Sequence, residues 1–125
     1  MGMDWEQLVG QAAARQQFER MRSSGRIPHA LLVNGPPGAG QLPFAMAAAR
    51  ELLAGEEQGN LPEDLTQHPD VHVVLPIFSK QEGGRAQTTD DFLPNFREAF
   101  AQRPYLSLGD WAASLDASNK QLLIP

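Results

Sequence analysis

The stretch from Gly35 to Leu42 is the part of the sequence whose residue types and spacing point most directly to chemistry. It reads Gly-Pro-Pro-Gly-Ala-Gly-Gln-Leu, and the phosphate-binding loop pattern is Gly, any four residues, Gly, Lys, then Ser or Thr. Gly35 and Gly40 have the spacing of the two pattern glycines. Such a loop turns backbone N–H groups inward, and the following helix N-terminus adds partial positive charge. The spacing therefore predicts a cradle for a phosphate group.

The two positions of the pattern that carry catalysis are replaced. Gln41 stands where the pattern has Lys, which reaches the β- and γ-phosphates, and Leu42 stands where a hydroxyl helps to hold Mg²⁺. Charge stabilisation of this kind contributes on the order of 3–4 kcal/mol per contact. We therefore expect no catalytic residue, no required cofactor, and weak binding of ATP or ADP at most. A glycine loop that is purely structural and binds no nucleotide is the alternative.

The other groupings of reactive side chains favour ordinary structural roles. His68 and His72 are four residues apart, but Pro69 between them argues against the helix that would bring them together as metal ligands. Asp90 and Asp91 precede an apolar helical pattern, where acids interact favourably with the helix dipole. No nucleophile and base are suitably spaced. We expect no metal site.

Hydrophobic periodicity and turn residues divide the chain into helices and two short strands. Apolar residues at helical spacing, or strong helix formers, predict helices over about Gln11–Ser23, Leu42–Leu53 and Phe92–Phe100, and a last helix opened by Ser107 with Asp110 as a capping pair. Continuous apolar runs predict buried strands over Ala30–Asn34 and Val71–Pro76. The glycine loop thus has a strand before it and a helix after it, as a phosphate loop requires.

Bulk composition excludes several classes of protein. The chain has 125 residues, 42% of them hydrophobic, which is enough for one packed domain. It has no cysteine, hence no disulfide and no thiolate zinc site, and the N-terminus lacks a secretory signal. No apolar run is long enough to span a membrane. The net charge of −5 is opposite to that of a domain that holds nucleic acid by itself. We expect a cytoplasmic protein without membrane contact.

The sequence around the glycine loop resembles a known family. Ser24–Leu32, which reads Ser-Gly-Arg-Ile-Pro-His-Ala-Leu-Leu, joined to Gly35–Gly38, is similar to the clamp-loader ATPases of the AAA+ class. Val9–Gln11 resembles the family segment that lies near the adenine, and His68–Asp70 resembles the segment before the second strand. The resemblance runs from about residue 5 to residue 76 and continues more weakly to the end.

This resemblance implies both a fold and a function. The implied fold class is α/β: a partial, three-layer P-loop NTPase domain over residues 1–125, without lid or C-terminal collar domains. The degenerate loop resembles that of delta-prime subunits rather than the gamma/tau motor subunits. The implied role is a non-hydrolysing structural subunit of the DNA polymerase III clamp loader, supporting sliding-clamp loading in DNA replication. The implied partners are the gamma/tau and delta subunits, through them the sliding clamp, and DNA only indirectly.

The implied ligand site is a vestigial nucleotide site. It takes in the glycine loop and two residues of the adenine-proximal segment: Gly35, Pro36, Pro37, Gly38, Ala39, Gly40, Gln41, Leu42, Val9 and Gly10.

The sequence departs from the family pattern in two respects. Many members of the family have a four-cysteine zinc module between the helix after the loop and the His-Pro-Asp segment, whereas the corresponding stretch here, Gly55–Gln67, has no cysteine, so we expect no zinc. The chain also ends at Pro125, before an acidic Walker B strand, so the resemblance implies an N-terminal piece of a longer protein. In the family's sheet order, 5-1-4-3-2, the two predicted strands are not neighbours. We therefore expect that the chain self-associates through unpaired strands or packs its strands in a way unlike the family's. Light scattering that shows a monomer with full helix and sheet content would refute this expectation.

Two alternative functions remain open from the residues alone. One is a stand-alone nucleotide-binding or nucleotide-sensing module. The other is an active P-loop enzyme, either a gamma/tau-like ATPase or a nucleotide kinase, that recruits a lysine from elsewhere; Lys80 and Lys120 are the only lysines in the chain.

Overall fold

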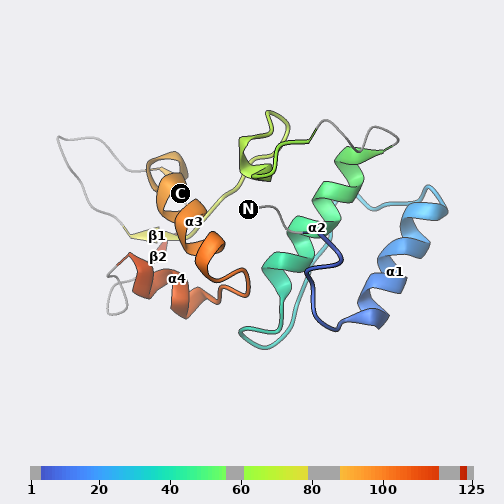
Figure 1. Ribbon diagram of the computed structural model, residues 1–125, viewed down its shortest axis with the longest axis horizontal. Coiled ribbons are helices and arrows are strands. Elements are labelled where there is room, and N and C mark those ends of the chain that lie inside the picture. Colours follow the sequence, from blue (N-terminus) through green and yellow to red (C-terminus); the bar gives the residue numbers. More distant parts are fainter. Residues whose placement is uncertain (1–3, 56–60, 79–87, 116–121, 124–125) are drawn as a thin grey trace.

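The computed structural model describes residues 4–55, 61–78, 88–115 and 122–123. Four α-helices, one short 3-10 helix (η1) and two very short strands follow one another along these residues (Figure 1). In chain order they are α1 (Ala12–Ser23), α2 (Gln41–Ala54), η1 (Leu65–Gln67), β1 (Ile77–Phe78), α3 (Thr89–Gln102), α4 (Leu108–Ser114) and β2 (Leu122–Leu123).

The predicted α/β three-layer P-loop domain is wrong for the described residues. Their one strand pairing is antiparallel and two residues long, joining Ile77 to Leu123 and Phe78 to Leu122. A parallel sheet needs neighbouring strands that satisfy each other's backbone N–H and C=O groups. Neither of the two apolar runs predicted as strands finds such a neighbour here, so the architecture is helical.

The run Ala30–Asn34 was predicted as a buried parallel strand, and this prediction is wrong. The structure assigns it no strand, and its side chains are largely exposed: Leu31 is 44% and Leu32 is 90% accessible. Only Val33 packs against the core. A short apolar run indicates burial only where another element covers it, and no described element does so here.

The strand predicted over Val71–Pro76 is also misplaced. The paired residues are the next two, Ile77 and Phe78, and 71–76 forms no ladder among the described residues. Pro76 lacks the N–H that a ladder requires at its position, which is consistent with pairing that begins just after it.

The predicted helices are confirmed. α1 matches the helix expected over Gln11–Ser23, and α2 matches Leu42–Leu53 extended by one residue at each end. Pro43 lies in the first turn of α2, where its missing N–H costs no intrahelical bond.

Side-chain caps start the last two helices. At α3, Thr88 and Asp91 form a reciprocal capping box, and Asp90 also lies in the first turn. At α4, the Ser107 hydroxyl accepts from the Asp110 N–H at 3.1 Å, and the Asp110 carboxylate accepts from the Ser107 N–H at 3.2 Å. This confirms the predicted capping pair, which satisfies N–H groups that a helix start otherwise leaves unpaired.

Helix α2 lies between α1 and α3 (Figure 1), and its side chains belong to two hydrophobic clusters. Phe44 and Ala48 belong to the smaller cluster, with Leu8 and with Phe18 of α1. Met46 and Ala47 belong to the larger one, whose other buried members are Leu65, Leu75, Ile77, Phe92, Phe96, Phe100 and Trp111. The rings of Phe96 and Phe100 stack at 5.8 Å, so the predicted apolar face of α3 is confirmed. Because α2 is packed on both sides, the position of the glycine loop at its N-terminus is fixed relative to the other helices.

Candidate functional site

The glycine loop leads directly into the N-terminus of α2, as predicted. Gly38 and Gly40 have φ values of 80° and 106°, a left-handed backbone region that favours glycine. The Ala39 N–H donates to the Pro36 carbonyl at 3.1 Å, which closes a turn inside the loop, and the Phe44 N–H donates to Gly40 at 2.9 Å. Two of the loop's three glycines are therefore required by the backbone geometry itself.

Gln41, which replaces the pattern's lysine, is bonded to the loop. Its Nε2 donates to the Gly35 carbonyl at 2.6 Å and to the Pro36 carbonyl at 2.8 Å. Both donors of the side-chain amide are thus directed at loop backbone rather than away from it. The uncharged side chain closes the loop on itself.

A small cavity lies beside the loop. Its volume is about 160 Å³, and it is lined by Gln11, Ala14, Val33, Asn34, Gly35, Pro36, Ala39, Gly40, Gln41 and Phe44. Pockets for drug-sized ligands and cofactors usually measure about 300–1,000 Å³. The cavity is therefore smaller than the usual site for a whole nucleotide, and none of its lining residues is Lys or Arg.

The structure brings together half of the predicted nucleotide-site residues. Of the ten, those that line the cavity are Gly35, Pro36, Ala39, Gly40 and Gln41. Those that do not line it are Pro37, Gly38, Leu42, Val9 and Gly10. Leu42, which stands where the pattern has Ser or Thr, instead packs against the larger hydrophobic cluster. Burial of this kind is usual for an apolar side chain. The Val9 side chain is 78% exposed, and its N–H donates to the Tyr105 hydroxyl at 2.7 Å.

Two residues that hold the loop were not among the predicted site residues. Gln11 Nε2 donates to the Ala39 carbonyl at 3.2 Å, which ties the segment before α1 to the loop. The Tyr105 ring lies against Gly40, where an added Cβ would meet its Cε1 at 3.0 Å. Gln11 is the last residue of the segment Val9–Gln11 that resembles the adenine-proximal one, so the sequence could have identified it. No spacing rule identifies Tyr105, because it reaches the loop only through the fold.

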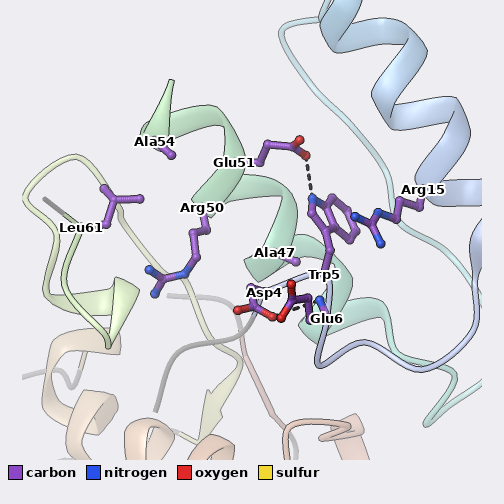
Figure 2. Close-up of a pocket in the computed structure, with 9 residues that line it drawn as sticks. All are labelled: Asp4, Trp5, Glu6, Arg15, Ala47, Arg50, Glu51, Ala54 and Leu61. Carbon is purple, nitrogen blue, oxygen red and sulfur yellow. Dashed lines mark hydrogen bonds between the residues drawn. The ribbon is translucent and has the colours of Figure 1, made fainter. Parts of the chain in front are cut away.

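A larger cavity, of about 410 Å³, lies beside Trp5 on the side of α2 that carries Arg50 and Glu51 (Figure 2). The Trp5 Nε1 donates to Glu51 Oε2 at 2.6 Å, and the Arg15 guanidinium lies 5.2 Å from the centre of the Trp5 ring. Arg50 points toward the opposite wall, and its Nη2 donates to the carbonyls of residues 62 and 63. No pattern in the sequence predicted this cavity.

Glu51, which accepts from Trp5, also takes part in an ion-pair cluster with α1. Arg22 bridges Glu51 at 3.1 Å and also bonds to Glu19 on its own helix. The hydrogen bond from Arg22 lowers the pKa of Glu19 below its usual value. These contacts join α1, α2 and the N-terminal segment, which gives this cluster a clear structural role.

The described residues offer no obvious metal site or membrane-spanning helix. No group of three or more His, Asp or Glu side chains among them is placed to hold a metal ion. His68 Nδ1 accepts from the Asp70 N–H at 3.0 Å, a local turn contact. Of the helices in this part of the chain, none has the length and apolar character needed to cross a bilayer. Lys80 and Lys120 lie outside the described residues.

Comparisons with protein-family models, with curated proteins and with solved structures found no match to this chain.

Proposed function

We propose that the chain is a non-hydrolysing structural subunit of a clamp-loader complex of the DNA polymerase III type, supporting sliding-clamp loading in DNA replication. The observation that carries the proposal is the geometry of Gln41. Its amide donates to two carbonyls of the glycine loop, at 2.6 and 2.8 Å, in the position where an active loop has a lysine. A loop that is closed internally by a neutral side chain supplies no charge to a phosphoryl group.

The proposal draws on the loop and the residues before it, and not on a parallel sheet. The motif Ser24–Leu32 followed by Gly35–Gly38 is the part of the sequence that resembles the clamp-loader family. Two left-handed glycines lead into a helix, which is the order of elements in a phosphate loop, while Leu42 packs against a hydrophobic cluster. A glycine loop without the lysine and the hydroxyl fits a scaffold better than a motor.

Calorimetric titration with ATP, with and without Mg²⁺, tests the absence of catalysis. We expect binding that is weak or undetectable, does not depend on Mg²⁺, and leads to no phosphate release. The matched variants are Gln41→Ala, which frees the two loop carbonyls, and Gln41→Lys, which also restores the charge. Lysine restores attraction for phosphate but no hydroxyl ligand for Mg²⁺, so we expect tighter nucleotide binding without turnover. Mg²⁺-dependent turnover by the wild-type chain would refute the proposal.

Co-purification tests the proposed assembly. The tagged chain is mixed with purified gamma/tau-type and delta-type clamp-loader subunits, and the complex is measured by size-exclusion chromatography with light scattering. We expect a stable complex that forms equally well with wild type and Gln41→Ala, because the loop acts as scaffold and not as a nucleotide switch. A chain that binds ATP without turnover but joins no subunit would instead indicate a stand-alone nucleotide-binding module.

A further inference from the structure

Residues 71–76 have the side-chain arrangement of a strand but lack a ladder partner among the described residues. Val71, Val73 and Leu75 pack on the larger hydrophobic cluster, whereas His72 and Val74 are exposed, Val74 to 62%. This strict alternation is that of a strand with one face on the core and one face open. The run leads directly into β1, where pairing with β2 begins (Figure 1).

The backbone of this run is anchored at one end and open in the middle. The Leu75 N–H donates to the buried Thr89 hydroxyl at 3.2 Å, and the Pro76 carbonyl accepts from Trp111 Nε1 at 2.7 Å. Between residues 72 and 74, no backbone hydrogen bond to another described segment exists. Exposed strand edges are usually blocked by a lysine or another charge, and residues 71–75 carry no Lys, Arg, Asp or Glu. Residues 71–75 thus have the exposed backbone edge of a strand, which is anchored at one end and carries no charged side chain that would prevent pairing.

A hollow of about 420 Å³ lies along this edge. The run forms one side of it, and Thr88, Asp90 and Leu93 at the start of α3 form the other. An added strand lies about 4.7–4.9 Å from its neighbour, and its side chains alternate between the two faces. The hollow therefore offers a place for side chains of a strand paired with residues 71–75.

The charge around the hollow indicates which kind of partner segment would fit there. Of the described residues that line the hollow, Asp90 is the one acid, and none is Lys or Arg. Arg97, a cation on the neighbouring helix α3, is bonded to Asp64 at 3.3 Å. Complementary charge favours a basic partner, and a second copy of this chain, at net charge −5, brings charge of the same sign. We propose that residues 71–75 bind an extended segment of a partner protein, rich in Lys or Arg, by strand addition.

Fluorescence anisotropy with a labelled synthetic peptide tests this proposal on the full 125-residue chain. The probe is a seven-residue peptide in which Val alternates with Lys. We expect saturable binding, lost when Lys is replaced by Glu in the peptide. It should also be lost when the peptide's backbone N–H groups are methylated on the pairing edge, because strand addition depends on main-chain hydrogen bonds. Equal binding of the methylated peptide would overturn strand addition.

Three variants of the protein test where the peptide binds. Val74→Lys puts a charge on the edge, and we expect it to weaken binding by about tenfold or more. Asp90→Asn removes one exposed charge, and about a two- to fivefold loss follows from the usual strength of such contacts. Leu32→Lys is the matched control, since Leu32 is a more exposed apolar residue in the other unpaired run, and it should bind like wild type. Circular dichroism verifies folding.

Two further outcomes would contradict the proposal. If Val74→Lys binds the peptide as tightly as wild type does, the edge at 71–75 is not the site. If light scattering shows a wild-type dimer that Val74→Lys converts to monomer, the occupant of the edge is a second copy and not a basic segment.

Discussion

Replacing Gly40 by alanine tests whether tertiary contacts, rather than a ligand, hold the glycine loop in its shape. Gly40 has a φ of 106°, where an L-residue with a Cβ is strained by about 1–2 kcal/mol. The new Cβ would also lie 3.0 Å from Tyr105 Cε1 and 3.5 Å from Leu8 Cδ1. The Tyr105 ring cannot move away freely, because its hydroxyl accepts from the Val9 N–H at 2.7 Å. Overpacking of this kind adds about 1–3 kcal/mol.

Gly38 provides the matched control for this prediction. Its φ is 80°, also left-handed, but a Cβ there would have no neighbour within 4 Å. Gly38→Ala should therefore cost only the backbone strain, about 1–2 kcal/mol. Gly40→Ala should cost about 2–5 kcal/mol in total, so the difference between the two variants isolates the contact with Tyr105.

Urea denaturation followed by circular dichroism measures both variants, and a Tyr105→Ala background completes a double-mutant cycle. In that background the extra cost of Gly40→Ala should disappear, leaving the cost of Gly38→Ala. Equal destabilisation by the two alanine substitutions in the wild-type background would refute the proposed packing of Tyr105 on the loop.

Three further predictions concern the core and a helix cap. Trp111→Phe keeps a ring in the core but removes the donor that bonds to the Pro76 carbonyl at 2.7 Å; we expect a loss of about 1–3 kcal/mol in the free energy of unfolding, measured in urea. Phe96→Ala removes the side chain that is 1% exposed at the centre of the larger cluster; calorimetry should show a loss of about 3–5 kcal/mol, and a much smaller loss would contradict its central place. The Ser107 backbone N–H, followed by its hydroxyl, lowers the pKa of Asp110 below the usual 3.8. A carboxyl group whose pKa is lower in the folded than in the unfolded protein stabilises the fold at pH values above its unfolded pKa. This stabilisation is lost as the pH falls through the folded-state pKa. Wild type should therefore be more stable than Asp110→Asn by a constant margin between about pH 6 and 8, and this margin should vanish in acid; a margin that persists in strong acid would show that charge is not its cause.

The helices and their caps followed from local sequence signals. The boundaries of α1 and α2 agree with prediction to within one residue, because strong helix formers and the glycines beside them act within a few residues. The Ser107 capping box was also predicted, since both partners lie within one helical turn.

The strands did not follow from the sequence, because a strand is defined by its neighbour. Ala30–Asn34 has the apolar composition of a buried strand, yet Leu32 is 90% exposed and no described segment pairs with it. The run 71–76 alternates as a strand should, yet pairing begins only at Ile77. Pairing depends on segments distant in the sequence, which local pattern does not specify.

The candidate site divides in the same way. The sequence by itself determined the glycine loop, its place before α2, and the absence of a lysine and a hydroxyl, because these are properties of consecutive residues. Tertiary structure alone decided that Tyr105 packs on Gly40, that Trp5 bonds to Glu51 across the N-terminal segment and α2, and that the cavity at the loop is small. Such contacts join residues far apart in the chain, and they form only where packing of the helices brings those residues together.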